Sequence, residues 1–203
     1  MKRLLFAILV ATILWFLMFA PCFTHRPNFW GMMVVSALIL NLIALPYLWA
    51  HREKCVWHRQ FLWGVLIACV LWGVFWLGDQ LSSLMFNFAR PQVESIYGMK
   101  DGNAPWLIGL LLLCLIGPAE EFFWRGYVQR HLSELWNPNK AFVVTTLVYT
   151  LIHLPSMNFM LIMSALVCGI CWGGIYRLFP HYFPAVVISH ALWDAAVFVW
   201  FPI

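Results

Sequence analysis

Three groups of ionisable residues lie inside strongly apolar segments of this 203-residue chain. In chain order they are Glu120-Glu121 with Arg125, then His153, then His190 with Asp194. A charged side chain at the centre of a bilayer costs about 2.5–3.5 kcal/mol on insertion scales. Such residues usually face the interior of a helix bundle or a wet cavity, where they do chemistry or support transport.

Helical spacing separates the roles of the two glutamates. Glu121 and Arg125 are four residues apart with the acid first, which is the better orientation for an ion pair on a helix. Glu120 is rotated by about 100° from Glu121, and position 124 holds a tryptophan rather than a cation. A carboxylate without an intrahelical partner can act as a base on water. The alternative is a charge cluster that only fixes helix packing.

The histidines allow similar chemistry. His190 and Asp194 are also four residues apart, so a hydrogen bond between them can orient the imidazole. Imidazoles and carboxylates are also zinc ligands. His153 ends an apolar run, and a polar residue that merely caps the helix is the alternative there.

Composition predicts the environment of these groups. The chain is 64% hydrophobic and 10% charged, with a mean hydropathy of +0.83, whereas soluble domains are about half apolar and about a quarter charged. We therefore predict an all-α, polytopic transmembrane bundle in a lipid bilayer. The net charge of +4 is too small and too dispersed to indicate nucleic-acid binding.

Seven apolar stretches predict about seven spans, at residues 4–23, 29–50, 61–77, 106–131, 141–153, 159–179 and 183–203. A span needs about 20 residues, so the fifth stretch either recruits residues before 141 or stops short of the far face. We favour an uncleaved first helix over a signal peptide. With the N-terminus inside, nine Lys and Arg residues lie toward the cytoplasm and Arg26, Arg90 and Lys100 lie outside. The positive-inside tendency then predicts an N-in, C-out orientation.

The chain divides into two expected parts. Residues 1–104 supply the N-terminal transmembrane helices plus an amphipathic segment over 79–104, which we expect to lie at the interface, with a substrate gate as the alternative. Residues 105–203 supply a four-helix core. At a rise of 1.5 Å per residue, Glu120, His190 and His153 lie about 9, 10 and 18 Å above the cytoplasmic edge, which predicts one shared cavity.

Three motifs in this order resemble a known family. Glu120-Glu-Phe-Phe-Trp-Arg125 resembles EExxxR, Tyr149-Thr-Leu-Ile-His153 resembles FxxxH, and His190-Ala-Leu-Trp-Asp194 resembles HxxxN or HxxxD. These are the motifs of the CAAX-protease and bacteriocin-processing (CPBP, or Abi) intramembrane endopeptidases. The resemblance implies that Glu120 and His153 activate water, that His190 and Asp194 stabilise the oxyanion or hold a metal, and that Glu121 and Arg125 support the site.

Two positions depart from the family pattern. Tyr149 replaces the usual Phe, which keeps the packing role and adds a hydroxyl. Asp194 stands where the eukaryotic prenyl-protein proteases carry Asn, and an ionised Asp cannot donate a hydrogen bond to an oxyanion. Asp194 therefore orients His190, is protonated, or binds a metal.

These observations predict an intramembrane endopeptidase acting on a membrane-associated protein or peptide. We favour a glutamic mechanism without a cofactor; zinc held by Glu120, His153, His190 and Asp194 is the alternative mechanism. A non-catalytic immunity or scaffold protein of the same fold, or a proton or ion carrier, are the alternative functions. A bacterial plasma membrane is the expected location, ahead of the endoplasmic reticulum.

Overall fold

The protein is a bundle of helices. The computed structural model describes residues 1–21, 28–51 and 57–203, and these residues contain no strand. The helices are α1 (Lys2–Phe19), α2 (Phe29–Ala50), α3 (Trp57–Met85), α4 (Ala89–Gly98), α5 (Pro105–Leu111), η1 (Leu112–Ile116), α6 (Gly117–Glu121), η2 (Phe122–Gln129), α7 (Arg130–Leu135), α8 (Pro138–Leu151), η3 (Leu154–Ser156), α9 (Phe159–Leu178), η4 (Pro180–Tyr182), α10 (Phe183–Ala195) and η5 (Ala196–Trp200). The all-α prediction is confirmed.

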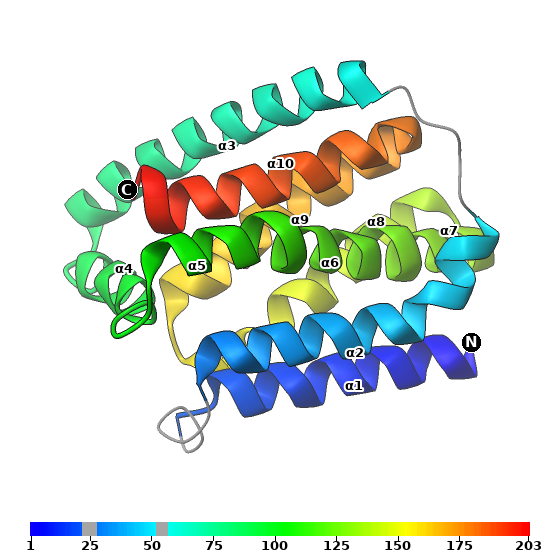
Figure 1. Ribbon diagram of the computed structural model, residues 1–203, viewed down its shortest axis with the longest axis horizontal. Coiled ribbons are helices and arrows are strands. Elements are labelled where there is room, and N and C mark those ends of the chain that lie inside the picture. The colour runs from blue at the N-terminus through cyan, green and yellow to red at the C-terminus, as the bar shows by residue number, and fades with distance from the viewer. Residues whose placement is uncertain (22–27, 52–56) are drawn as a thin grey trace.

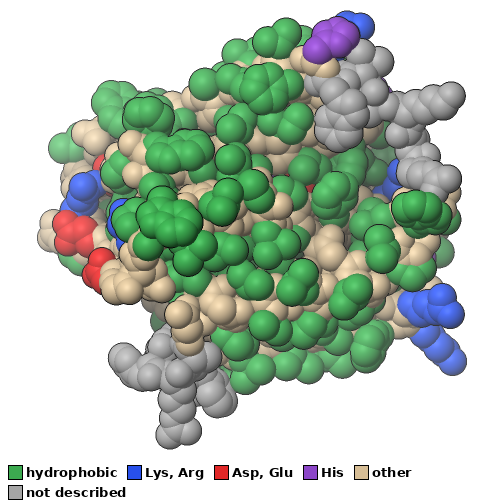
Figure 2. Space-filling model, viewed as in Figure 1, with side chains coloured by type: hydrophobic (Ala, Val, Ile, Leu, Met, Phe, Trp, Pro, Cys, Tyr) green, Lys and Arg blue, Asp and Glu red, His purple; other side chains and the backbone are tan. Residues whose placement is uncertain are grey.

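Six helical segments are long and apolar enough to cross a membrane. They are Lys2–Phe19, Phe29–Ala50, His58–Met85, Pro105–Leu135, Phe159–Leu178 and Pro180–Trp200. Hydrophobic side chains cover the middle of the face in Figure 2, while acidic and basic side chains lie toward its edges. This distribution suits a bundle whose middle contacts lipid tails, and the predicted polytopic architecture is confirmed.

Helix α8 is the exception among the predicted spans. It begins at Pro138, before the apolar run, where the Asn137 side chain accepts from two backbone N–H groups. Its 14 residues rise about 21 Å, less than the 30 Å of a bilayer core. The two chain ends lie at opposite ends of the bundle (Figure 1). The count of seven spans and the N-in orientation stay predictions. Arg52 and Lys54, which favour the orientation, and Arg26, which it places on the outer side, lie outside the described residues.

The polar connection between the third and fourth spans forms a short helix of its own. Helix α3 continues to Met85, and α4 occupies Ala89–Gly98. Asn158 donates its amide N–H to the Gln92 carbonyl at 2.9 Å, and the Gln92 side chain accepts from the Met160 backbone at 3.0 Å. These bonds attach α4 to the start of α9.

Small residues allow the closest helix contacts. A Cβ on Gly64 of α3 would lie 2.8 Å from the Ile188 Cβ of α10, and one on Gly169 of α9 would lie 3.0 Å from Thr146 Cγ2 of α8. Gly169 and Gly173, which are four residues apart in α9, therefore both pack against α8. Helix α10, which carries His190 and Asp194, is held from one side by α3.

We expect Gly64→Leu to loosen α3 from α10. The added side chain must displace Ile188, and overpacking of this kind costs about 1–3 kcal/mol. Gly73→Leu is the matched control, because a Cβ on Gly73 meets nothing within 4 Å. Thermal unfolding in detergent should show a lower midpoint for the Gly64 variant alone. Equal midpoints for the two variants would show that the α3–α10 contact tolerates a side chain.

Candidate active site

The glutamate pair lies in an irregular part of a long helix. Wide π-helical segments, η1 and η2, flank the five residues of α6. Pro118 has no backbone N–H to donate to the carbonyl four residues earlier, and the Gly117 N–H bonds to the Leu112 carbonyl, five residues back. π-Segments inside α-helices are frequent at functional sites.

Gly117 brings this segment against α10. A Cβ at this position would lie 2.8 Å from the Ala191 Cα and 3.0 Å from the Ala191 backbone nitrogen. Backbone atoms cannot move aside as a flexible side chain can. The absence of a side chain on Gly117 thus permits the close approach of α6 to the His190 region.

Glu121, Arg125, His190 and Asp194 form one buried charged network. Arg125 Nη1 donates to Glu121 Oε1 at 2.7 Å, and the same oxygen lies 2.7 Å from His190 Nδ1. His190 Nε2 lies 3.3 Å from Asp194 Oδ2. The exposed fractions run from 0% for Glu121 to 8% for Asp194. If His190 is an imidazolium, it donates to both carboxylates and the four charges sum to zero.

Aromatic rings enclose this network. The Trp172 indole stacks on the His190 imidazole, with ring centroids 3.8 Å apart and planes 19° apart. The Arg125 guanidinium lies 4.9 Å from the centroid of the Tyr149 ring. Both pairs predicted from the spacing of four residues, Glu121 with Arg125 and His190 with Asp194, are present.

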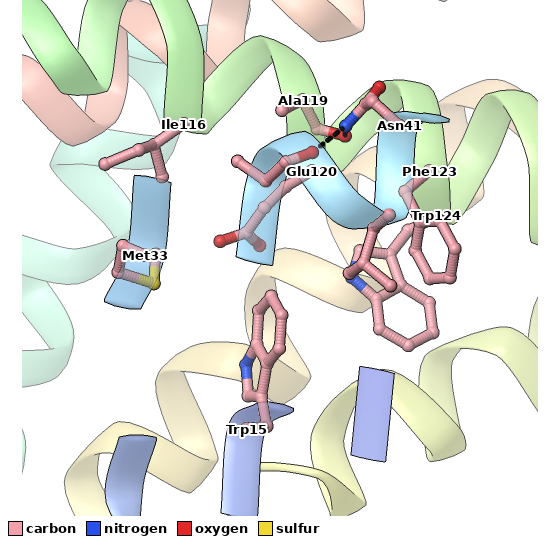
Figure 3. A pocket seen from close by; sticks show the side chains of 10 residues that line it. Trp15, Met33, Asn41, Ile116, Ala119, Glu120, Phe123 and Trp124 are labelled. Atoms are coloured by element: carbon pink, nitrogen blue, oxygen red, sulfur yellow. Dashed lines mark hydrogen bonds between the residues drawn. The ribbon is translucent and has the colours of Figure 1, made fainter. Parts of the chain in front are cut away.

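Glu120 lies outside the charged network. Its Oε2 accepts a hydrogen bond from the Tyr149 hydroxyl at 3.1 Å. The hydroxyl that distinguishes Tyr149 from phenylalanine therefore contacts the predicted base. Glu120 also lines a small cavity, about 10 Å³ in volume, together with Trp15 of α1, Asn41 of α2 and Trp124 of η2 (Figure 3).

Both ring nitrogens of His153 have partners. Nδ1 lies 2.8 Å from the Tyr149 carbonyl, which can only accept, so this nitrogen carries the proton. Nε2 accepts from the Trp15 indole N–H at 3.2 Å. These partners define a neutral imidazole whose lone pair is occupied while Trp15 stays in place.

Tyr149 connects the predicted residues. Its hydroxyl binds Glu120, its carbonyl binds His153, and its ring faces Arg125 of the charged network. Among the described residues, Glu120 makes no direct hydrogen bond to His153 or His190. The predicted site thus consists of two adjoining groups of side chains rather than one directly bonded set.

The N-terminal helices complete the cavity, which the sequence does not predict. Trp15 is one of 13 tryptophans and has no distinguishing spacing. Asn41 lies in an apolar helix, and its amide nitrogen donates to the carbonyls of Ala37 at 2.8 Å and Ala119 at 3.0 Å. The division at residue 104 stays a prediction; residues from both sides of it line this cavity.

The zinc set that the sequence offers as the alternative does not fit this arrangement. Within residues 1–21, 28–51 and 57–203, no group of three or more His, Cys, Asp or Glu side chains is placed to hold a metal ion. The His153 nitrogens bind Tyr149 and Trp15, and those of His190 face two carboxylates. We therefore assign no step to a metal.

The comparisons with known proteins support the resemblance. Residues 102–196 match the family model described as type II CAAX prenyl endopeptidase Rce1-like. This match spans just under half of the chain, contains all seven predicted site residues and confirms the resemblance of the three motifs. No curated protein and no solved structure matches the chain. At the level of the family, the match supports a CAAX-type protease, and the six apolar helices support an integral membrane protein.

Proposed function

We propose that the protein is an intramembrane endopeptidase that uses Glu120 as the base in hydrolysis of a membrane-associated protein or peptide. The observation that carries this proposal is the Glu120 carboxylate, which lies on a membrane-spanning segment and lines a water-sized cavity between that segment, α1 and α2. Glu121 binds both Arg125 and His190 through its Oε1, so the two adjacent carboxylates have separate roles.

The reaction follows ordinary general-base chemistry. Glu120 takes a proton from water, the hydroxide oxygen bonds to the peptide carbonyl carbon, and the carbonyl oxygen becomes an oxyanion. The protonated Glu120 then gives this proton to the departing amine nitrogen as the C–N bond breaks. Tyr149 holds the carboxylate in place through its hydroxyl.

His190 is the proposed partner of the oxyanion. Of its two carboxylate contacts, the one to Asp194 is the longer, at 3.3 Å against 2.7 Å. An oxyanion can displace Asp194 from Nε2 while Glu121 and Trp172 keep the ring oriented. In this scheme Asp194 orients the ring and does not donate to the oxyanion. The scheme therefore does not need a hydrogen bond that an ionised Asp cannot donate.

His153 has a conditional role in this scheme. Its Nε2 lone pair accepts from Trp15, so it can help Glu120 with water only after that indole moves. A cavity of about 10 Å³ holds no peptide segment, and Trp15 and Asn41 line it from α1 and α2. Entry of a substrate therefore requires α1 or α2 to move away from α6.

The experiment that tests the proposal compares membrane peptidomes. Cells carrying the unmodified protein and cells carrying Glu120→Gln are analysed by mass spectrometry. We expect at least one membrane-associated peptide whose cleavage disappears in the variant, which would supply substrate and reaction together. Identical peptidomes with an intact cellular phenotype would favour a non-catalytic protein of the same fold. Because a bacterial plasma membrane is the expected location, the comparison is made first in a bacterial host.

Removal of metal ions should leave proteolysis intact. The described side chains form no metal-binding group, and the proposed steps need only Glu120, Tyr149 and His190. We expect the purified protein to keep its rate after exhaustive chelation, with elemental analysis to verify removal. A loss of activity that zinc alone restores would support the zinc alternative.

A further inference from the structure

A buried hydrogen-bond donor without a partner faces the Glu120 cavity. Among the described residues, two tryptophans, Trp124 and Trp193, have a buried indole N–H that bonds to nothing. Leaving a buried donor unsatisfied is costly, so most such groups bond to the protein or to an ordered water. Only Trp124, whose exposed fraction is 0%, lines the cavity beside Glu120 (Figure 3).

The volume of this cavity fits one water molecule. A cavity needs about 10–15 Å³ to hold a water, and this one has about 10 Å³. Buried waters typically bond to two to four polar groups that are otherwise unsatisfied. The Glu120 carboxylate supplies an acceptor and the Trp124 N–H supplies a donor, while residues such as Met33, Ala37 and Ile116 make the remaining wall apolar.

The other side-chain N–H donors at this cavity already have partners. The Asn41 amide nitrogen uses both hydrogens, on the carbonyls of Ala37 and Ala119. The Trp15 indole N–H donates to His153. Among the described residues that line the cavity, the Trp124 N–H is thus the side-chain donor that remains for a water.

The sequence position of Trp124 supports this assignment. It lies four residues after Glu120, where residues share one face of a helix. Glu121 has Arg125 as its partner at this spacing, whereas the residue at this spacing from Glu120 is a tryptophan, whose N–H is neutral and unpartnered. A neutral donor leaves the carboxylate free to take a proton, which an arginine at this position would oppose.

We infer that Trp124 holds the attacking water against Glu120. Its indole N–H donates to the water oxygen, and the water donates one hydrogen to the Glu120 carboxylate. When that hydrogen passes to Glu120, the oxygen forms the new bond to the peptide carbon, and Trp124 has kept it in place until then. This inference rests on the proposed function, because it supplies the position of the nucleophile for the same reaction.

Trp124→Phe tests the inference, with Trp193→Phe as the matched control. Both changes delete a buried, unpartnered indole N–H, but Trp193 does not line the cavity and instead packs on Phe75 and Trp172. We expect about a tenfold lower kcat for Trp124→Phe with KM unchanged, and nearly unmodified kinetics for Trp193→Phe. An unchanged kcat for Trp124→Phe would overturn the inference.

A second measurement is independent of activity. In the ¹⁵N-tryptophan-labelled, unmodified protein in lipid nanodiscs, the Trp124 indole proton should show magnetisation transfer from a long-lived water, and the Trp193 proton should not. If the Trp124 indole proton shows no magnetisation transfer from water, the inference is overturned, even if Trp124→Phe fails to fold. A bound water at Trp124 in a protein that cleaves nothing would instead reject the proposed function and keep the water site.

Discussion

Glu121→Gln is expected to lower the free energy of unfolding by about 3–5 kcal/mol, the usual cost of breaking a buried ion pair. Glu121 is fully buried, and its Oε1 contacts both Arg125 and His190 at 2.7 Å. A neutral amide leaves the arginine, whose exposed fraction is 1%, without a compensating charge. Burial of an unpaired charge is far more costly than burial of a neutral polar group.

Glu94→Gln is the control for this change. Glu94 pairs with Arg90 at 3.7 Å, but its side chain is 68% exposed, and surface pairs of this kind contribute about 0–1 kcal/mol. Denaturant unfolding in mixed micelles should separate the two variants clearly. If the free energies of unfolding of Glu121→Gln and Glu94→Gln differ by less than about 1 kcal/mol, the buried network does not stabilise the bundle as its geometry implies.

Glu120→Gln is expected to lower kcat by about 10²–10⁴-fold, the range that general-base catalysis supplies. The amide keeps the size of the side chain, and its oxygen can still accept from Tyr149. It cannot take a proton from water. Folding should therefore be retained while hydrolysis is lost, which distinguishes this glutamate from its neighbour Glu121.

Glu134→Gln serves as the kinetic control, because Glu134 lies on the same spanning segment but is 46% exposed near Arg130 and His51. Initial rates on a peptide identified from the peptidome comparison should match those of the unmodified protein. If Glu120→Gln keeps more than about a tenth of the kcat of the unmodified protein, the loss is smaller than general-base catalysis supplies. That result would show that Glu120 is not the base.

Local spacing explains which parts of the site the sequence predicts correctly. Glu121 with Arg125, and His190 with Asp194, are each four residues apart, and one helical turn brings such pairs together in any fold. The helices themselves follow from long apolar runs. These features depend on neighbours in the chain, so the sequence alone is sufficient to find them.

Contacts between distant segments are not predictable in this way. The bond between Trp15 and His153 joins residues 138 positions apart, and that between Glu121 and His190 joins residues 69 apart. The contact between Glu121 and His190 depends on the close approach at Gly117, which the spacing of residues in the sequence does not predict. Sequence analysis therefore identifies both glutamates but does not predict that Glu121, rather than Glu120, binds His190.

The partners of Tyr149 show an intermediate case. Its hydroxyl is visible in the sequence as a departure from the family motif, but the acceptor, Glu120, lies on another helix. The irregular turns η1 and η2 flanking α6 are also missed, because Pro118 indicates a disturbed helix without indicating its form. The proposed base, Glu120, lies within this irregular segment, where local rules are least informative.

A single-turnover reaction in H₂¹⁸O, with enzyme in excess over the identified peptide, tests the central claim most directly. If Glu120 acts as a base on water, one ¹⁸O atom enters the new carboxylate of the product, and mass spectrometry of the enzyme finds none in the Glu120 side chain. If instead Glu120 attacks the peptide carbonyl and forms an anhydride, water can open it at the glutamyl carbon. Incorporation of ¹⁸O into Glu120 would contradict the account.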